Sequence, residues 1–445
     1  MAEREYGETA ALMRPTPAGK KIRILSGWSA VPVRLKFALS LGKYLFRRKR
    51  YPLFTLKASQ RGFLKTYQTL QDLRVCKTLK FMSHYYLGLT SPRWPSQAFD
   101  HMVGRGGLNI TAAGTPFKQQ IDTAILGISR KCIYHCRHCY EHFNLGEEET
   151  VPLDCWKDTI KQLQEIGASI ITFSGGEPML RYEGLVELLV SADHSRSDFH
   201  LHTSGHGVTL ERARNLKAAG LAAAAVGLDD VNPERHDALR GYPGAFLEAL
   251  QAIRFFQEAG VFTYLNMCLT KDIVRSGDLP SYIELAKGLG VGAVRFLEPR
   301  PCGAYLGENG EDLFSSGDRM AVTQWFEKVN VSRLYRHYPF ISYEAYFEAP
   351  ERLGCMMGGH SLLYIDSLGY VVPCVFVPVS FGKITEEKFL DIFQRLRKCI
   401  PQPLHRPCPS LALADKIRAK HDQGLSLPVP FLEIQKEWQE IFGQE

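Results

Sequence analysis

The sequence lacks several features that would assign it to a large class of proteins. Its 445 residues contain no apolar run of the roughly 18 residues that a membrane-spanning helix needs. The first residues include Glu3, Arg4 and Glu5, which do not form a secretory signal. Internal repeats and low-complexity tracts are also missing. With 45% hydrophobic and 23% charged residues, the chain is predicted to be a cytoplasmic globular protein of two or three domains.

Acidic residues are absent between Glu8 and Asp72, where apolar residues recur every four positions beside a cluster of basic ones. The apolar positions are Val33, Phe37, Leu41 and Leu45, and the basic ones are Arg34, Lys36, Lys43, Arg47, Arg48, Lys49 and Arg50. The pattern predicts a cationic amphipathic helix, and two possibilities remain for what this helix contacts. Either residues 30–52 contact an anionic membrane surface, making the protein peripheral to the membrane, or the helix packs its apolar face on the protein.

Strand-like and helical patterns alternate between residues 121 and 300. The apolar runs are Ala124–Ile128, Ser169–Phe173, Phe199–Thr203, Ala222–Leu228, Val261–Cys268 and Gly292–Leu297. Six strands with helices between them predict an α/β fold with a parallel sheet, as an open barrel or a doubly wound sheet. Residues 1–120 are expected to form a basic, partly helical extension. Residues 301–445 are expected to form a smaller α+β region with short β-like pieces and a closing helix.

Cysteine is abundant, with eleven residues in the chain. Thiols stay reduced in the cytosol, so clustered cysteines there indicate metal binding or catalysis. Cys132, Cys136 and Cys139 follow the first predicted strand, at the sheet edge where α/β proteins place their chemistry. Three thiolates on one loop hold three irons of a 4Fe–4S cluster and leave the fourth iron open. The alternative is a zinc site completed by His135 or His138.

The C-x3-C-x2-C spacing of this triplet resembles the signature of the radical S-adenosylmethionine (SAM) superfamily. The resemblance implies a partial (βα)6 TIM-like barrel with Cys132, Cys136 and Cys139 as catalytic cluster ligands. It also implies that the open iron binds the amino and carboxylate groups of SAM. Reduction of the cluster then cleaves SAM to a 5′-deoxyadenosyl radical, which abstracts hydrogen from a substrate. A reducing partner such as flavodoxin or ferredoxin is expected.

Three further motifs resemble the SAM-binding elements of this family, at the ends of the second, third and fourth strands. They are Ser174–Pro178, His202–Gly205 and Gly227–Gly241. The resemblance implies SAM-binding roles for Gly175, Gly176, Glu177, Pro178, Thr203, Ser204, Asp229 and Arg240. Thr203 and Ser204 equally suit an ordinary helix cap, and Arg240 equally suits a salt bridge to Asp237. Gly227 stands where the family branch has serine, and Asp230 stands where it has glycine.

The last quarter of the chain resembles a SPASM or twitch auxiliary-cluster domain. Cys355 is followed by 13 residues, Gly369, four residues and Cys374, which is the opening of that motif. The C-x2-C pair of the full motif is missing, so one auxiliary iron–sulfur cluster is expected. Its implied ligands are Cys355, Cys374 and Cys408, with Cys399 as the fourth. Cys399 also fits a buried position on a helix, and zinc is the alternative metal.

The preferred function is therefore a radical SAM enzyme with an unidentified substrate, namely a peptide, a cofactor precursor or a lipid-linked molecule. The alternative is a non-catalytic iron–sulfur protein for electron transfer or redox sensing. The net charge of +7 is modest and no RNA-binding module is present, so no nucleic-acid partner is expected. Asn266, Cys268 and Cys302 fall near the ends of the fifth and sixth strands, where each could line the site or fill the core.

Overall fold

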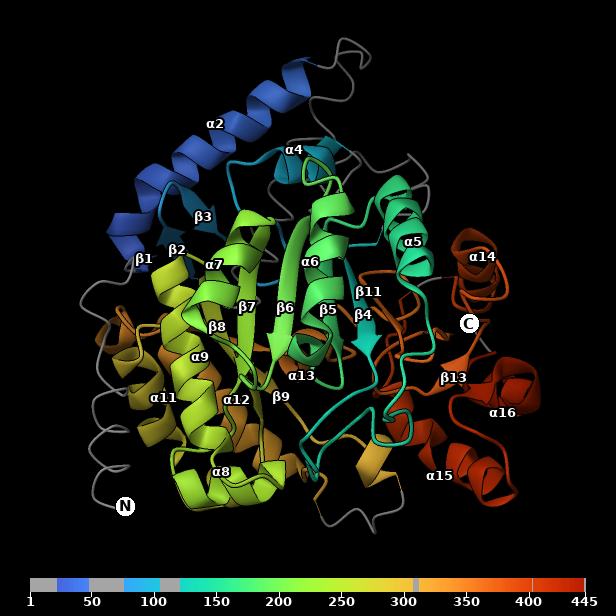
Figure 1. Ribbon diagram of the computed structural model, residues 1–445. Coiled ribbons are helices and arrows are strands. Elements are labelled where there is room, and N and C mark those ends of the chain that lie inside the picture. The colour runs from blue at the N-terminus through green and yellow to red at the C-terminus, as the bar shows by residue number, and fades with distance from the viewer. Residues whose placement is uncertain (1–21, 48–75, 105–120, 307–311, 402, 444–445) are drawn as a thin grey trace.

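A computed structural model describes residues 22–47, 76–104, 121–306, 312–401 and 403–443 (Figure 1). Its central element is a nine-stranded sheet with the order β10-β9-β8-β7-β6-β5-β4-β11-β12. The six predicted strands form the consecutive, parallel middle of this sheet. They are β4 (Thr123–Ser129), β5 (Ile170–Gly175), β6 (Asp198–Thr203), β7 (Leu221–Gly227), β8 (Phe262–Cys268) and β9 (Ala293–Leu297). The predicted parallel α/β fold is confirmed.

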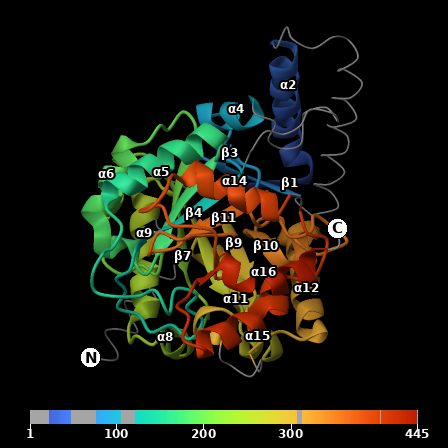
Figure 2. The ribbon, with the colours of Figure 1, turned by 90° about the vertical axis from the view of Figure 1, so that its right-hand side faces the viewer.

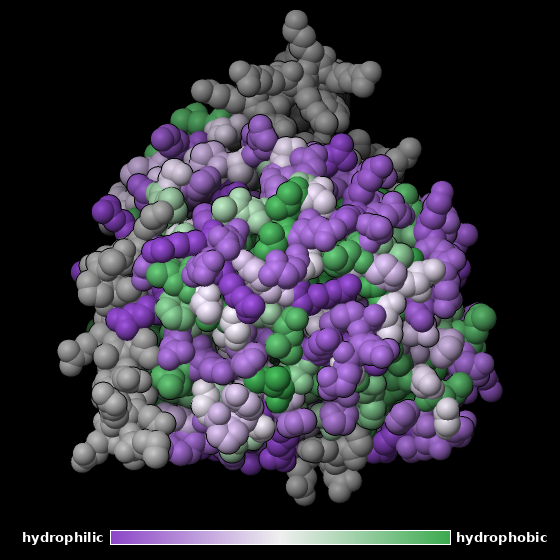
Figure 3. Space-filling view, viewed as in Figure 1, coloured by the Kyte–Doolittle hydropathy of each residue, from purple (hydrophilic) through white to green (hydrophobic). Residues whose placement is uncertain are grey.

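Amphipathic helices between these strands cover one face of the sheet (Figure 1). They are α5 (Leu153–Ile166), α6 (Tyr182–Ser191), α7 (Leu210–Ala218), α8 (Pro233–Arg240), α9 (Ala245–Ala259), α10 (Lys271–Arg275) and α11 (Leu279–Gly288). Gly167 and Gly260 end α5 and α9 in the left-handed conformation, with φ of 98° and 80°. The surface in Figure 3 intersperses hydrophilic and hydrophobic side chains over these helices, while their apolar faces join one large core.

The C-terminal third of the chain extends the sheet at both ends. At one end β10 (Phe340–Tyr343) pairs in parallel with β9, and at the other β11 (Leu362–Ile365) pairs in parallel with β4. β12 (Val371–Val372) then forms the antiparallel partner of β11, as the turn between Tyr364 and Tyr370 predicts. The sheet therefore crosses the boundary expected at residue 300.

Helices and short elements complete the C-terminal third. Before the turn lie η4 (Gly303–Tyr305), α12 (Ser316–Val331), η5 (Arg333–Tyr335) and α13 (Glu344–Phe347). After it come α14 (Phe389–Cys399), α15 (Pro409–Asp422) and α16 (Phe431–Phe442), which Figure 2 shows gathered on one side of the molecule. The short strands β13 (Val379–Ser380) and β14 (Val429–Pro430) pair in parallel and connect α16 to the rest of this region. The closing helix predicted from the pattern is α16.

The N-terminal region contains more regular structure than the sequence pattern indicates. Three strands, β1 (Arg23–Ser26), β2 (Lys77–Phe81) and β3 (His84–Tyr86), form an antiparallel sheet. Phe81 and Tyr86 pack on Phe262 of β8, with ring centroids 5.9 and 3.8 Å apart. The apolar side chains of this small sheet form one buried cluster with residues of β7 to β10 of the large sheet.

The predicted basic helix is α2 (Val31–Arg47), preceded by the short η1 (Gly27–Ala30). Val33 and Phe37 of α2 pack against α4 (Gln97–Gly104) and Trp94. No helix among the described residues has the length and apolar character required to cross a bilayer.

Candidate active site

A cavity of about 300 Å³ lies at the carboxyl ends of the central strands. Residues from β4 through β9 all contribute to its wall, so the sheet curves around it as a partial barrel does. Two groups of cysteines line the same cavity. The first is the triplet Cys132, Cys136 and Cys139, and the second consists of Cys302, Cys355, Cys374 and Cys408.

The loop that carries the triplet is held by backbone contacts from two distant elements. The amide N–H groups of His135 and Arg137 donate to carbonyl oxygens at the end of α8, at 3.0 Å each. On the other side, the N–H of Ala304 donates to the Cys139 carbonyl at 2.8 Å. Gly303 makes that approach possible, because a Cβ there would lie 2.1 Å from the same carbonyl oxygen. The positions of the three thiols are therefore fixed by the fold.

The chemistry of the triplet fits an iron–sulfur cluster with one open iron. Burial raises the pKa of Cys132 to about 12 and also raises the pKa values of Cys136 and Cys139. Such thiols ionise when a metal centre or a nearby cation stabilises the thiolate. Arg240 supplies one cation, since its Nη1 lies 4.0 Å from Cys136 Sγ. Three sulfur donors correspond to three of the four irons of a 4Fe–4S cube.

Gly175 and Gly176, at the end of β5, lie directly against the triplet loop. Gly175 has φ of 122°, and a Cβ on it would lie 2.4 Å from the Ser129 carbonyl oxygen. A Cβ on Gly176 would lie 2.3 Å from the Lys131 carbonyl oxygen. Both glycines line the cavity. Their lack of side chains brings exposed backbone next to the cysteines, as the predicted SAM contact requires.

Glu177 and Pro178 do not line the cavity, unlike the other six residues predicted to bind SAM. Glu177 is buried and accepts hydrogen bonds from the Thr203 hydroxyl at 2.7 Å and the Ser204 N–H at 2.8 Å. Burial raises the pKa of Glu177 to about 7 despite these bonds. Pro178 is buried at the start of η3 (Pro178–Arg181). These two residues therefore join the ends of β5 and β6 and support the cavity-lining residues from behind.

Arg240 and Asp229 form a buried ion pair on the cavity wall. Arg240 Nε donates to Asp229 Oδ2 at 2.7 Å, and Nη1 donates to Ser204 Oγ at 3.2 Å. Burial raises the pKa of Asp229, but Arg240 and nearby histidines outweigh it and bring the pKa to about 2. Asp237 instead accepts the N–H groups of Gly244 and Phe246. The alternative pairing of Arg240 with Asp237 is therefore not formed.

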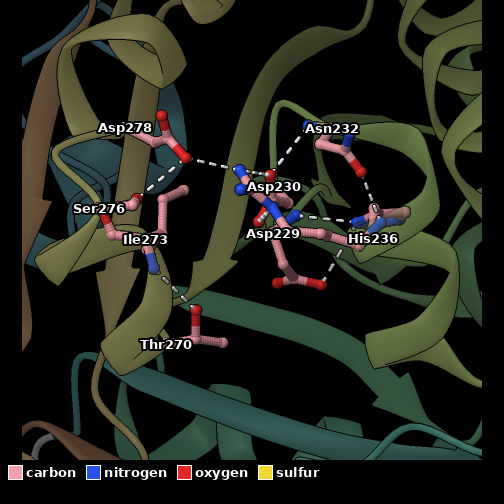
Figure 4. Close-up of polar contacts among 9 residues, drawn as sticks. Asp229, Asp230, Asn232, His236, Thr270, Ile273, Ser276 and Asp278 are labelled. Carbon is pink, nitrogen blue, oxygen red and sulfur yellow. Dashed lines mark hydrogen bonds and ion pairs between the residues drawn. The ribbon is translucent and has the colours of Figure 1, made fainter.

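The two departures from the family pattern have structural explanations. A Cβ on Gly227 would lie 2.4 Å from Arg240 Nη2, so glycine leaves room for the guanidinium. Asp230 caps the turn before α8, accepting from the Asn232 N–H at 2.8 Å and from Arg235 at 2.7 and 2.9 Å (Figure 4). Arg235 also donates a hydrogen bond to Asp278, and none of these residues lines the cavity, so this network faces away from it.

Cys302 joins three predicted ligands in the second cysteine group. It follows β9, whereas Cys355 and Cys374 belong to the segment around β11 and β12, and Cys408 precedes α15. Burial raises the pKa values of Cys302, Cys355 and Cys374, and the charge of Cys408 raises each of them further. The thiols are thus electrostatic neighbours. Four cysteines suit a complete ligand set for an auxiliary iron–sulfur cluster.

The structure does not bring Cys399 into this group. It ends α14, packs against the main core and does not line the cavity. Burial raises its pKa, and Arg395 is the charge that acts on it. Cys399 therefore occupies a helical position beside the core, in line with the alternative interpretation of this residue. Sequence reasoning did not group Cys302 with the other three cysteines because it lies outside the SPASM-like motif.

Single-ion zinc sites gain no support from the side-chain geometry. A tetrahedral zinc ion requires its sulfur and nitrogen ligands to converge at about 2.0–2.3 Å. Over the described ranges, no group of three or more His, Cys, Asp or Glu side chains could hold one metal ion. Cluster ligands bind different irons, so they do not need to converge on a single point.

A curved parallel sheet with two cysteine groups around one cavity defines an iron–sulfur enzyme of the partial-barrel type. Residues 126–274 match the Radical SAM superfamily, and residues 355–410 match the iron–sulfur cluster-binding domain named SPASM. The chain belongs to the radical SAM superfamily, in the branch with a C-terminal SPASM domain. Its cofactors are accordingly SAM, a SAM-binding 4Fe–4S cluster and auxiliary iron–sulfur clusters. Like other members of the family, it needs a reductant and a substrate.

Curated relatives include heme synthases and a peptide cyclase. AdoMet-dependent heme synthase from Nitratidesulfovibrio vulgaris is 26% identical over 316 residues, covering 63% of this chain and 84% of the relative. The heme synthase from Methanosarcina barkeri is 29% identical over 308 residues, covering 62% and 84%. PqqA peptide cyclase from Streptomyces rochei is 30% identical over 258 residues, covering 56% and 68%.

Two solved structures share the fold at low sequence identity. SuiB from Streptococcus suis, bound to its precursor peptide SuiA, superposes with a TM-score of 0.52 at 15% identity. The match covers 62% of this chain and 65% of SuiB. The enzyme anSMEcpe with bound AdoMet gives a TM-score of 0.50 at 16% identity, covering 73% of this chain and all of that one.

Proposed function

We propose that this enzyme binds its SAM-cleaving cluster through Cys132, Cys136 and Cys139 and acts on a substrate held in the cavity. The main support for this proposal is that both cysteine groups line one cavity. When bound, the cluster supplies an electron that cleaves SAM to methionine and the 5′-deoxyadenosyl radical. Flavodoxin or ferredoxin is the proposed source of that electron.

Arg240 is proposed to recognise the carboxylate of SAM. Asp229 and Ser204 hold its guanidinium at the cavity wall, and a planar guanidinium binds a carboxylate through paired N–H donors. Gly175 and Gly176 present exposed backbone to the same space. The remaining predicted cavity residue, Thr203, donates its hydroxyl to Glu177, so its role is to orient the end of β6.

Cys302, Cys355, Cys374 and Cys408 are proposed to hold the auxiliary cluster. A cluster bound there would supply an electron acceptor in the wall of the cavity, which favours an oxidative reaction of the substrate.

We propose a cofactor precursor that carries carboxylates, such as a porphyrin, as the substrate. Beyond Arg240, the cavity is lined by Arg295 and Arg300. Arg295 Nε lies 3.3 Å from Glu344 and its Nη1 lies 3.4 Å from His202, whereas Arg300 lies 3.4 Å from Glu298. Guanidinium groups beside apolar wall residues such as Ile125, Leu297 and Met357 suit a flat, apolar ring with anionic substituents. Similarity to the heme synthases supports this class, and similarity to PqqA peptide cyclase makes a peptide the second candidate.

The test is anaerobic reconstitution with iron and sulfide, followed by reduction and addition of SAM. We expect the wild type to form 5′-deoxyadenosine and the Cys136→Ala variant to form none. Porphyrin and peptide pools, each followed by mass spectrometry, then distinguish the two substrate classes. Replacement of Arg295 by Gln should raise the KM for a carboxylate substrate without changing substrate-free SAM cleavage. Absence of 5′-deoxyadenosine from the reconstituted wild type would refute the proposed chemistry.

A further inference from the structure

An apolar stripe runs along the outward side of α2 and the short η1 before it. The exposed fractions are 87% for Trp28, 37% for Val31, 60% for Leu35 and 68% for Leu39. These residues follow one another at spacings of three and four, so they share one side of the helix. Large apolar side chains exposed singly are ordinary, but four in line form a surface that water solvates poorly.

The opposite side of α2 fixes the orientation of this stripe. Ala30 and Val33 are buried, and the Phe37 ring packs edge-on against Trp94 and Phe99 at 5.3 and 5.5 Å. Arg34 Nη2 donates to the Cys76 carbonyl at 2.8 Å and adds a polar attachment. Both ribbon views show α2 projecting beyond the rest of the described chain (Figure 1, Figure 2). The stripe is thus held outward by packing on the other face.

The charge around the stripe has one sign. Lys36 is exposed beside it, and the sequence that follows adds the basic residues Lys43 and Arg47 without an acidic one. The surrounding sequence from residue 9 to residue 71 contains no acidic residue. A partner for this surface must therefore be apolar at its centre and negatively charged at its border.

We propose that α2 binds the surface of an anionic lipid bilayer, with Trp28, Leu35 and Leu39 inserted among the acyl chains and Lys36 at the headgroups. A bilayer interface offers the required combination over a flat area, and Trp is well suited to it. A second copy of α2 would bring two cationic surfaces together. Residues 48–71 of this chain are also free of acidic residues and so do not complement the charge.

The experiment uses the full-length, cluster-loaded protein and sedimentation with vesicles. We expect binding to phosphatidylcholine vesicles that contain phosphatidylglycerol, weak binding to pure phosphatidylcholine, and loss of binding at high salt. Leu35→Gln combined with Leu39→Gln should lower the partition coefficient by about tenfold or more. The matched control replaces Leu334 and Leu432, two exposed leucines elsewhere, by Gln and should bind like the wild type.

Formation of 5′-deoxyadenosine provides the check on folding, because none of these leucines lines the cavity. The proposal is overturned by equal binding to charged and neutral vesicles, by no binding, or by an α2 double variant that binds like the wild type. It is also overturned if sedimentation velocity shows that the stripe joins two copies, or if an acidic protein competes vesicles away at the same site with higher affinity.

Discussion

At the scale of single residues, we expect different effects on iron content from replacing Cys302 and Cys399. Replacing Cys302 by Ala should remove the auxiliary cluster, which lowers iron content by about four atoms per chain. SAM cleavage should persist, since the triplet is unchanged. Cys399→Ala is the matched variant and should keep full iron content, because Cys399 ends α14 and packs against the main core outside the cavity. Iron and sulfide analysis with EPR measures both. Loss of iron from the Cys399 variant alone would reverse the ligand assignment.

Gly227 provides a second test at this scale. A serine there would push the Arg240 guanidinium away, because its Cβ would lie 2.4 Å from Nη2. Loss of a charged hydrogen bond costs about 1.5–3 kcal/mol, so we expect the dissociation constant for SAM to rise about tenfold or more. Gly88→Ser, at a position with open space, is the control. Equilibrium binding of SAM to the reconstituted protein measures the effect, and unchanged affinity in Gly227→Ser would contradict it.

The sequence indicated most residues of the site but not all of their tasks. Motif position placed Gly175, Ser204 and Arg240 near the triplet because parallel strands end at one edge of the sheet. Motif position does not distinguish a residue that faces the cavity from Glu177, which lies behind it. Cys302, the fourth cysteine of the second group, was not predicted there, because spacing rules apply within a motif, whereas Cys302 follows the end of another strand.

At the scale of elements, Lys77 of β2 connects stability to pH. Burial lowers its pKa to about 7, while its Nζ donates to the carbonyls of Tyr338 and Pro339 at 2.8 and 3.2 Å. In the unfolded chain a lysine has a pKa of about 10.4. Between these values the unfolded state binds more protons than the folded state, so stability rises with pH and falls again as pH drops toward 7.

Replacing Lys77 by Met should remove this pH dependence. The slope in the wild type approaches about 1.4 kcal/mol per pH unit over that window. Urea unfolding at pH 7 and pH 9.5 measures the difference between wild type and variant. Lys80→Met, in the same strand but less buried, should keep the wild-type slope. Parallel pH profiles for wild type and Lys77→Met would show that the buried ammonium group is not responsible.

The elements with strong periodicity were predicted and the short ones were not. All six central strands were found because buried apolar residues dominate most of them, and in β6 they alternate with His200 and His202. β1, β2 and β3 were not predicted because they are only three to five residues long and mix basic, polar and apolar side chains without a clear period. Their place against Phe262 depends on contacts with the central strands, which local pattern does not encode.

At the scale of the whole molecule, the barrel and the SPASM region share one sheet and one polar network. Glu141, just after the triplet, accepts hydrogen bonds from the hydroxyls of Tyr364 at 2.5 Å and Ser367. Asn144 Nδ2 bridges Glu141 and Asp366 at 3.3 Å each. Burial raises the pKa values of both carboxyl groups, and the charge of Glu141 raises that of Asp366 further. The two regions are therefore joined by main-chain pairing and by buried side chains.

We expect the described regions to unfold in one cooperative transition rather than two. Calorimetry and circular dichroism should give coincident midpoints, because separation would expose the edges of both β4 and β9. A fragment of residues 121–300 should aggregate when expressed alone. Two resolved transitions, or a soluble fragment that binds SAM, would show that the shared sheet does not couple the regions. Sequence matching assigns each region separately, and it does not reveal the pairing of distant strands.

The pairing of β11 with β4 also has a consequence for synthesis of the chain. About 240 residues separate the two strands, which corresponds to roughly 10–50 s of translation. During that interval the triplet loop has left the ribosome, while Tyr364 and Ser367, which later enclose Glu141, have not been made. We expect newly made chains to present the three thiols on an incomplete sheet, where both oxygen and the cellular cluster-assembly machinery can reach them. Order of synthesis thus sets a limited period in which the radical-generating centre is most accessible for loading.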